Sequence, residues 1–409
     1  MKILVVCQHY YPEPFRITDI CEELVKRGHE VSVITGLPNY PKGEIYPGYR
    51  DKSKREEEIN GVKVHRCFTI GRKGGVVKRV LNYYSFALSS KAYAARLKEE
   101  FDVVLVNQLS PVMMAWAGIR YKKKHKKKLV LYCLDLWPES LIAGGIKRGS
   151  IIYKIFRKVS EKVYRQADTL LITSRMFRGY LEKEFGIPDE KIFYLPQYAE
   201  SLFTPEDCQK EPDGKIDLMF AGNIGAAQSV QTILRAAKLT QDIKNLYWHI
   251  VGDGSERERC EKLASELGLK RVTFYGKKPL SEMPIYYKKA DAMLVSLMKD
   301  PVLSLTLPGK VQTYMAAGKP LICSADGETA EVVKEADCGL CSGAEDAEAL
   351  AENVRRFCLN YKLNGIEIFF KNSLKYYRKN FQGKVFFERL EVFLRNESST
   401  KRAEKDEKR

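Results

Sequence analysis

Lys310 and Glu328 each stand beside the start of a predicted helix in the stretch 301–340. A proline and Gly309 end a loop, and the residues that follow have helical spacing. A short apolar strand and the polar loop 324–329 then lead to a second helix. Free backbone N–H groups and the helix dipole at such a start suit a phosphate, and Lys310 adds a full positive charge. The stretch therefore indicates an anion site. The alternative is that these are ordinary α/β loops and that Lys310 is a solvated surface lysine.

A second set of anion-binding candidates lies earlier in the same half of the chain. Gly222, Asn223 and Gly225 form a turn between a predicted strand and a predicted helix, and successive N–H groups in such a turn can bind phosphate. Lys277 and Lys278 follow the end of another predicted strand, where they would face the same crevice. The alternative is that the turn only joins its strand to its helix.

The N-terminal half carries a different set of candidates after the predicted strand 129–133. Asp135 follows this strand directly, and a carboxylate at the end of a parallel strand points into the ligand crevice. Trp137 would offer a flat platform for a sugar ring, with Glu139 beside it. The alternative is that Trp137 is a core residue and Glu139 caps the next helix. Arg16 ends a proline-rich turn after the first strand, and we expect it to face the crevice unless the turn is simple loop punctuation.

The elements that position these residues alternate between strand and helix in the doubly wound manner of α/β proteins. A chain of 409 residues with 44% hydrophobic content is long enough for two such domains. A proline-rich, charged segment separates them. The predicted divisions are an N-terminal domain 1–196, a linker 197–214, a C-terminal domain 215–375, a C-terminal helix 376–395 and a disordered tail 396–409.

The cysteine distribution and the net charge indicate the environment in which the protein works. The ten cysteines are scattered, so neither a disulfide framework nor a zinc site is indicated, and a reducing cytosol fits best. No apolar run has the length of a membrane span, so we expect any membrane contact to be peripheral. The formal net charge of +17 suggests an anionic partner: a phosphorylated substrate, a membrane surface or a nucleic acid.

Two basic groups in the N-terminal half are candidates for contact with an anionic membrane. One opens a predicted aromatic-bearing helix, and the other is a lysine run that ends the following helix. They comprise Arg72, Lys73, Lys78 and Arg79, and Lys122, Lys123, Lys124, Lys126, Lys127 and Lys128. The alternatives are a core helix with a solvated basic end, and a helix C-terminus that complements its dipole. Nucleic acid is disfavoured because no aromatic residue is interleaved in the lysine run.

Three segments carry a resemblance to a known family. PGKVQTYMAAGKPLICSADGETAEVV resembles the donor-binding segment of family 4 (group 1) glycosyltransferases, and RGHEVSVIT is similar to the usual beginning of these proteins. DLWPESL resembles their bacterial surface-polysaccharide branch, typified by the L-fucosamine transferase WbuB. The resemblance implies the GT-B architecture, in which two Rossmann-like domains face each other across a cleft, and a last helix that crosses back to the N-terminal domain.

The resemblance also implies an activity. It is a retaining transfer of a hexosyl or N-acetylaminosugar residue from a nucleotide-diphosphate sugar, expected to be UDP-linked, to a lipid-linked saccharide during capsule or O-antigen synthesis. We expect no cofactor and no metal, because the chain has no Asp-x-Asp, and a location on the cytoplasmic face of the cell membrane. Asp135, Lys310 and Glu328 are the expected catalytic residues, and Arg16, Asp135, Trp137 and Glu139 would bind the acceptor. The donor would be bound by Gly222, Asn223, Gly225, Lys277, Lys278, Gly309, Lys310, Thr313, Gly327, Glu328 and Thr329.

One departure from the family pattern concerns the donor. Most members carry two glutamates in the donor segment, and by register these fall on Leu305 and Thr313. Neither residue can accept hydrogen bonds as a carboxylate does, so either other groups hold the ribose or the activity is weakened or lost. The competing hypotheses are therefore a non-catalytic partner subunit on the same fold and a nucleic-acid-binding protein.

Overall fold

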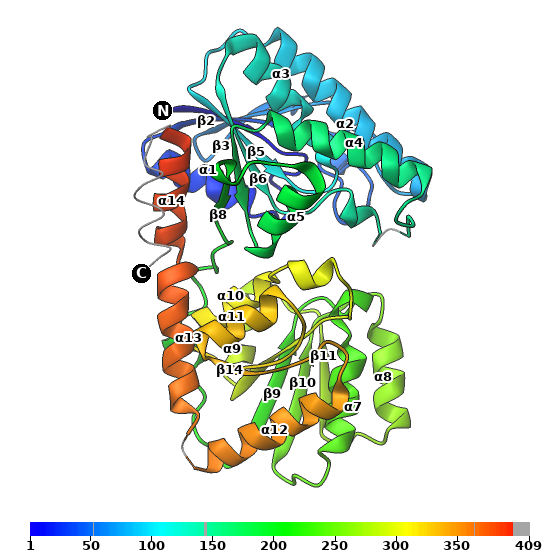
Figure 1. Ribbon diagram of the computed structural model, residues 1–409, viewed down its shortest axis with the longest axis vertical. Helices are drawn as coiled ribbons and strands as arrows, with labels where there is room; N and C mark the ends of the chain where they lie inside the picture. The colour runs from blue at the N-terminus through cyan, green and yellow to red at the C-terminus, as the bar shows by residue number, and fades with distance from the viewer. Residues whose placement is uncertain (52, 143–144, 364, 396–409) are drawn as a thin grey trace. The chain divides into compact units, whose positions relative to one another are not determined.

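The computed structural model describes residues 1–51, 53–142, 145–363 and 365–395, which form two compact units (Figure 1). Among the described residues, unit 1 comprises 1–173, 177–195 and 387–395, and unit 2 comprises 174–176 and 196–386. Each unit has its own sheet, parallel in unit 2 and parallel except for one strand pair in unit 1, with helices between the strands. The predicted tail 396–409 lies outside the described residues.

In the described part of unit 1, eight strands form one sheet in the order β3-β4-β2-β1-β5-β6-β7-β8. Neighbouring strands are parallel except β3 and β4, which are antiparallel. Continuous apolar runs such as ILVV in β1 are buried because helices cover both faces of a parallel sheet. The strands are β1 (Lys2–Val6), β2 (Glu30–Thr35), β3 (Glu56–Ile59), β4 (Val62–Arg66), β5 (Val103–Gln108), β6 (Lys128–Cys133), β7 (Thr169–Ile172) and β8 (Ile192–Tyr194).

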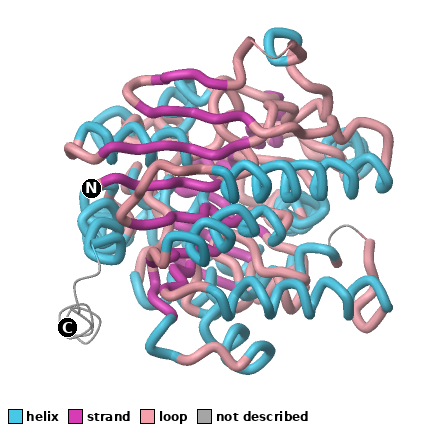
Figure 2. The backbone as a smooth tube through the Cα atoms, turned by 90° about the horizontal axis from the view of Figure 1, so that it is seen from above, coloured by secondary structure: helices cyan, strands magenta, loops and turns pink. Residues whose placement is uncertain are grey.

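The helices of unit 1 connect successive strands of the sheet, as in a doubly wound fold. Figure 2 shows strands lying side by side with helices flanking them. The helices are α1 (Ile17–Lys26), α2 (Val76–Arg96), α3 (Trp116–His125), α4 (Ile151–Gln166) and α5 (Met176–Phe185). The lysine run ends α3: Lys126 takes a left-handed conformation with φ 54° directly after His125. This is the helix C-terminus that was one interpretation of the run.

In the described part of unit 2, six parallel strands have the order β11-β10-β9-β12-β13-β14. This is the strand order of a Rossmann fold. The strands are β9 (Ile216–Ala221), β10 (Leu246–Val251), β11 (Val272–Gly276), β12 (Ala292–Ser296), β13 (Leu321–Ser324) and β14 (Gly339–Ser342). The helices are α6 (Pro205–Cys208), α7 (Val230–Leu239), α8 (Arg257–Glu266), α9 (Met283–Tyr287), α10 (Gly309–Ala316), α11 (Glu328–Ala336), α12 (Ala347–Lys362) and α13 (Glu367–Asn380).

Successive side chains of β9 point to opposite faces of the sheet and so belong to two different layers of the core of unit 2. Leu218 and Phe220 pack on one face of the sheet with residues of α7, α8 and α12, whereas Met219 and Ala221 pack on the other face with residues of α10 and α11. Successive side chains of a strand point to opposite faces, so a strand that is apolar at every position is covered on both sides. The predicted pair of Rossmann-like domains is confirmed.

Two segments differ from the predicted divisions. The linker 197–214 packs into unit 2: Phe203 is buried and stacks on Tyr287 with ring centroids 4.8 Å apart. The predicted helix 376–395 is interrupted after Asn380, and a second helix, α14 (Gly383–Arg395), follows. The break falls at Phe381-Gln382-Gly383. Phe381 is fully buried, and Gly383 is a poor helix former in a position that a continuous helix would have to include.

From residue 387 onward α14 belongs to unit 1. Glu391 faces His29, with Oε1 and Nε2 2.8 Å apart, and the Lys128 ammonium donates to the carbonyl of Phe393 at 2.7 Å. The Phe393 ring also packs against Phe193, with centroids 5.0 Å apart. From residue 387 onward, α14 therefore packs as an integral part of unit 1.

Candidate functional site

The carboxyl ends of the six strands in unit 2 meet at one edge, and the strand order reverses between β9 and β12. Ligands of open α/β sheets bind at such a switch point. The predicted glycine turn, with Gly222 and Asn223 exposed, follows β9, and Lys310 follows β12 in the first turn of α10. The fold therefore brings together the two predicted anion-binding stretches.

The ammonium group of Lys310 occupies this switch point. A Cβ added to Gly222 would lie 3.3 Å from Nζ, and Nζ is 4.0 Å from the centroid of the Phe220 ring. The residue as a whole is half-buried, but its Nζ is sealed from solvent and has no hydrogen-bond partner among the described residues. Burial lowers the pKa of Lys310 to about 7.

A sealed cation without a partner is unfavourable, because the lost hydration is not replaced. An anion at the glycine turn would supply the missing partner. The start of α10 would assist it, since Gly309 is exposed and no side chain caps the first turn. Lys277 is exposed after β11 at the same edge, while the ammonium of Lys278 lies over the Tyr286 ring, 5.5 Å from its centroid.

Three further residues predicted for the donor site make contacts within unit 2. Thr313 donates its hydroxyl to the carbonyl of Gly309 at 2.9 Å, inside α10. Thr329 is fully buried. Gly327 has φ 64°, and a Cβ there would lie 2.0 Å from the carbonyl oxygen of Ser304, so another residue would not fit. The loop before α11 is thus held against the loop before α10.

Glu328 has a structural partner that the sequence did not reveal. Its carboxylate is 1% exposed and accepts from the Arg175 guanidinium at 2.9 Å and from the backbone N–H of Met176 at 3.1 Å. Arg175 also pairs with Glu335, two turns further along α11. Both carboxylate oxygens of Glu328 are engaged, which favours a structural role for this residue over a catalytic one.

We therefore expect Glu328→Ala to lower the stability of the protein. Breaking a buried ion pair costs about 3–5 kcal/mol, and the partial exposure of Arg175 reduces the expected loss to roughly 2 kcal/mol. Urea unfolding measures it, and Glu335→Ala, which removes the exposed partner of the same arginine, is the matched control with an expected change near zero. An unchanged midpoint for Glu328→Ala, accompanied by a loss of transfer, would restore the catalytic interpretation.

Asp135 lies at the corresponding edge of unit 1, after β6. Its Oδ2 accepts from both the backbone N–H and the hydroxyl of Ser110, each at 3.0 Å, and the Ser110 hydroxyl in turn accepts from the Trp137 indole at 2.8 Å. Burial raises the pKa of Asp135 above its usual range. The chain of hydrogen bonds fixes the carboxylate and leaves Oδ1 without a hydrogen bond from any described residue. Ser110, in the loop after the neighbouring strand β5, could not have been found from the sequence pattern.

The sugar platform expected at Trp137 is absent, because the side chain is 1% exposed and lies in the core. Glu139 is also buried, and it accepts from the hydroxyls of Tyr153 and Tyr180 at 2.8 Å and from Arg148 at 2.7 Å. The DLWPESL motif is therefore an internal framework that presents Asp135. Arg16 occupies the N-cap position of α1 and is half-buried.

The two basic groups of unit 1 lie at opposite edges of its sheet, since α2 follows the carboxyl end of β4 and α3 leads into the start of β6. At the first edge Lys78 and Arg79 are exposed, Arg72 lies over the Tyr40 ring and Lys73 pairs with Glu44. No helix in the described ranges is long and apolar enough to cross a membrane.

Much of the lysine run is engaged within unit 1. Lys122 binds Asp168 and the carbonyl of Gln166, and Lys124 binds the carbonyl of Leu97. Lys127 pairs with Glu100, and Lys128 reaches α14. Lys123 and Lys126 are left exposed. The run is therefore a weaker candidate for membrane contact than the start of α2.

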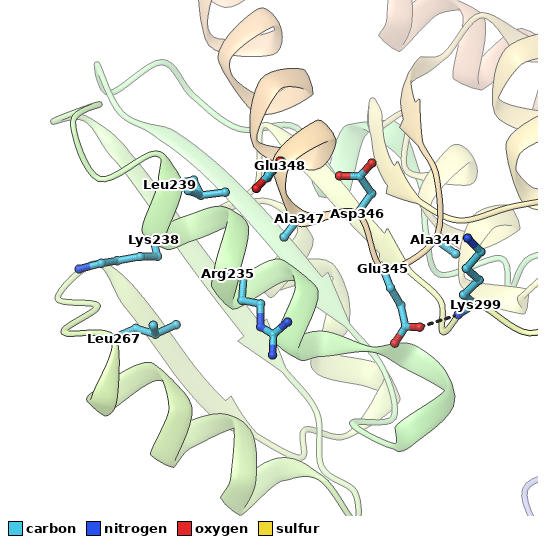
Figure 3. A pocket seen from close by; sticks show the side chains of 10 residues that line it. All are labelled: Arg235, Lys238, Leu239, Leu267, Lys299, Ala344, Glu345, Asp346, Ala347 and Glu348. Atoms are coloured by element: carbon cyan, nitrogen blue, oxygen red, sulfur yellow. Dashed lines mark hydrogen bonds between the residues drawn. The ribbon is translucent and has the colours of Figure 1, made fainter.

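A cavity of about 650 Å³ in unit 2 lies away from the predicted donor residues (Figure 3). It is bordered by Arg235 and Lys238 of α7 and by the start of α12 at Glu348. Glu345 accepts from the backbone N–H of Lys299 at 3.1 Å at its edge. None of the residues predicted for the donor lines it.

Comparison with known proteins decides the family. A model described as Glycosyltransferase Family 4 matches residues 16–197, and a model described as Glycosyl transferases group 1 matches residues 206–366. The chain is a glycosyltransferase of this family. The first match falls on unit 1 and the second on unit 2, so the glycosyltransferase contains both halves of the family's architecture.

This glycosyltransferase is 27% identical over 394 residues to a protein of Escherichia coli K12 named as the colanic acid biosynthesis glycosyl transferase WcaI, covering 90% of this chain and 94% of that protein. It is 27% identical over 257 residues to the Pseudomonas aeruginosa glycosyltransferase WbjE, covering 60% and 63%. Similar solved structures are the sucrose-phosphate synthase of Thermosynechococcus elongatus, at TM-score 0.73, 18% identity and 96% and 98% coverage, and Anabaena HepE in complex with UDP, at 0.70, 14% and 96% and 99%. These structures confirm the GT-B architecture.

Proposed function

We propose that this glycosyltransferase moves a sugar from a UDP-linked donor to a lipid-linked saccharide, with retention, during the synthesis of a bacterial surface polysaccharide. The observation that carries the donor assignment is the sealed, unpartnered ammonium of Lys310 at the switch point of unit 2. A diphosphate would neutralise this cation and accept from the start of α10 and from the glycine turn.

The chemistry follows from the same contact. As the bond between the sugar and the nucleotide breaks, negative charge develops on the leaving diphosphate. A fixed cation in a dry site stabilises that charge more strongly than water would. UDP is the nucleotide we favour, since the structurally similar HepE was solved with UDP and with UDP-glucose. Retention and the polysaccharide pathway are supported by the family and by relatives such as WcaI.

A membrane surface is the expected location because a lipid-linked acceptor lies there. Val77 on α2 is 72% exposed and Ile151 on α4 is 78% exposed. The two helices flank the same buried ring, with Tyr83 of α2 6.4 Å and Phe156 of α4 5.6 Å from Trp137. Both helices begin at the carboxyl edge of the sheet, which is also the edge that presents Asp135.

More exposed apolar residues extend this surface, and exposed basic residues accompany them. The apolar residues are Val77, Val80, Leu81, Leu88, Ile151, Ile152 and Ile155, and the basic residues are Lys78, Arg79, Lys154 and Lys158. We call this set the α2/α4 face. Apolar side chains with a basic rim match an anionic bilayer, which takes the former into its interface and attracts the latter.

A nucleotide panel followed by a transfer assay tests the function. We expect UDP to raise the melting temperature more than UMP, since one phosphate fills less of the site, and we expect ADP and GDP to raise it less than UDP. Proton NMR of products formed with UDP-N-acetylhexosamines and polyprenyl-diphosphate-linked N-acetylglucosamine then reads the anomeric configuration. No shift with any nucleoside diphosphate would contradict the donor assignment.

The missing carboxylates at Leu305 and Thr313 support a second candidate, a non-catalytic partner on the same fold. The hydroxyl proton of Thr313 is used inside α10, so this residue is a poor substitute for a glutamate. The same assay separates the two. Nucleotide binding without transfer or donor hydrolysis would favour the partner subunit.

A further inference from the structure

A buried tyrosine hydroxyl lies where β9 and β12 separate at the switch point of unit 2. Among the described residues, the pairing between these strands ends at Met219 and Met293, and β9 continues to Ala221. The backbone N–H of Ala221 donates to the hydroxyl of Tyr314 at 2.9 Å, and this hydroxyl donates to the carbonyl of Ala221 at 2.7 Å. One side chain of α10 therefore takes the place of a neighbouring strand at the end of β9.

Burial keeps this hydroxyl in the form that both hydrogen bonds require. Tyr314 is fully buried, and its burial raises the pKa of the hydroxyl above the ordinary value, so the proton stays on the oxygen. A protonated hydroxyl has one hydrogen to donate and lone pairs that accept. The ring meets Tyr287 of α9 edge-on, with centroids 5.5 Å apart, which fixes its position. Without the hydroxyl, the buried N–H and carbonyl of Ala221 would both lose this partner.

Tyr314 lies one helical turn after Lys310. Residues four apart lie on the same face of a helix, so the Tyr314 hydroxyl and the Lys310 ammonium reach the end of β9 from one face of α10. The hydroxyl bonds Ala221, and the ammonium lies beside the next residue, Gly222, and over the ring of Phe220. Two residues of α10 thus meet three consecutive residues of the segment that forms the predicted donor site.

The glycine turn is held on its other side by the loop after β10. The N–H of Gly222 donates to the carbonyl of Val251 at 2.9 Å, and the N–H of Ile224 donates to the carbonyl of Asp253 at 2.8 Å. Both of these bonds join backbone to backbone. The turn is therefore fixed to β10 by its own backbone, whereas a side-chain hydroxyl ties it to α10.

We propose that Tyr314 is a positioning residue of the donor site. Its hydroxyl holds the end of β9 against α10, so that the N–H groups of the glycine turn and the ammonium of Lys310 present a single diphosphate site. A ligand that needs both groups binds more tightly when their spacing is fixed before it arrives, because binding then orders less of the protein. The proposal rests on the proposed function and adds the residue that assembles its diphosphate site. Tyr314 acts through these groups and not on the donor itself.

The test measures the affinities for UDP and UMP by calorimetry in wild type, Tyr314→Phe and Tyr287→Phe. Tyr314→Phe keeps the ring and removes the hydroxyl. We expect it to weaken UDP binding at least fivefold and to reduce the preference for UDP over UMP at least threefold, because misalignment matters most to the ligand that fills the whole site. Tyr287→Phe is the matched control: its hydroxyl makes no hydrogen bond to another residue in the described ranges, and both affinities should stay unchanged.

A double-mutant cycle distinguishes positioning from a general structural role. Tyr314→Phe is introduced a second time, in the background of Lys310→Met. If the hydroxyl acts by placing the turn relative to Lys310, the fold-loss of UDP affinity caused by Tyr314→Phe should be at least threefold smaller in this background. Equal losses in the two backgrounds would overturn the proposal.

The outcomes separate this inference from the function beneath it. A wild-type protein that binds no nucleoside diphosphate would contradict the donor assignment itself. Wild type that binds UDP, together with Tyr314→Phe within twofold of it, would overturn the role of Tyr314 alone. If Tyr314→Phe fails to fold, amide hydrogen exchange of the wild type decides. We expect the amide of Ala221 to be protected without ligand as strongly as the preceding amides of β9, and exchange at the rate of an open loop would overturn the proposal.

Discussion

Lys310→Met should lower the affinity for UDP more than tenfold and, in the same protein, raise the melting temperature without ligand. The first effect follows because the ammonium is the full positive charge that meets the diphosphate, and tenfold corresponds to about 1.4 kcal/mol. The second follows because methionine fills the space above Phe220 without a sealed, unpartnered charge. Calorimetric titration and thermal unfolding measure the two effects.

The affinity for UDP should also fall as the pH rises above about 7. Burial depresses the pKa of Lys310 to about 7 in the ligand-free fold, whereas the unfolded chain has the ordinary value of 10.5. Between these two values the unfolded state binds one more proton than the folded state, so the ligand-free protein becomes more stable as the pH rises. A bound diphosphate favours the charged lysine, so binding in this range takes up a proton. Titrations in buffers of different ionisation enthalpy detect that proton, and Lys310→Met should abolish its uptake.

Lys319 provides the matched control. It is a second buried lysine of unit 2, with its pKa lowered to about 8, but its ammonium donates to the carbonyl of Ala290 at 2.6 Å. We expect Lys319→Met to lower stability, because that carbonyl loses its donor, and to leave UDP affinity unchanged. If both variants lost stability and both kept their affinity, Lys310 would be a structural residue and not part of a donor site.

Binding to anionic vesicles at high salt should be lost when four apolar residues of the α2/α4 face are replaced: Val77→Ser, Leu81→Ser, Ile151→Ser and Ile155→Ser together. These side chains are exposed in the structure, so their replacement leaves the core intact. Each residue of the basic rim contributes on the order of 1 kcal/mol to the binding free energy near an anionic surface, and salt weakens this contribution. The apolar residues contribute a second part of the binding free energy, which salt does not weaken. Co-sedimentation with anionic and with zwitterionic vesicles, at low and high salt, measures the two contributions.

The control for this experiment comes from the other edge of unit 1. Lys123→Gln and Lys126→Gln remove two exposed charges of the lysine run without breaking an internal contact, and we expect this variant to sediment as wild type does. If the variant with Lys123→Gln and Lys126→Gln lost vesicle binding while the four-serine variant kept it, the lysine run would be the membrane contact. Equal binding to both vesicle types would exclude an electrostatic surface altogether.

The parts of the site that depend on sequence-local features could be predicted. A glycine turn after a strand and a lysine in the first turn of a helix are local patterns, and their meeting at a switch point follows from the Rossmann strand order. This is why Gly222 and Lys310 were predicted together. The fold class could be predicted for the same reason, because the alternation of strand and helix is visible in the local hydrophobic pattern of the sequence.

Residues whose roles depend on distant partners could not be predicted. Trp137 and Glu139 stand in a motif that suggests a binding surface, but Ser110, Tyr153 and Tyr180 complete a buried network around them. The sequence indicates Glu328 as a catalytic candidate, but Arg175, 153 residues away in the sequence, lies beside it and binds its carboxylate. Periodicity shows which face of an element is buried, but not which polar group from another element meets a given side chain.

The position of α14 has a consequence for how the protein is made. Unit 1 contains the first residues of the chain and also its last described helix, which covers His29 through Glu391 and binds Lys128 through a backbone carbonyl. Unit 2 lies between them in the sequence and is synthesised in full before α14 leaves the ribosome. Domains usually complete their folding in the order of synthesis. Here unit 1 begins first and is completed last, so a chain released after residue 386 contains all of unit 2 but lacks the part of α14 that belongs to unit 1.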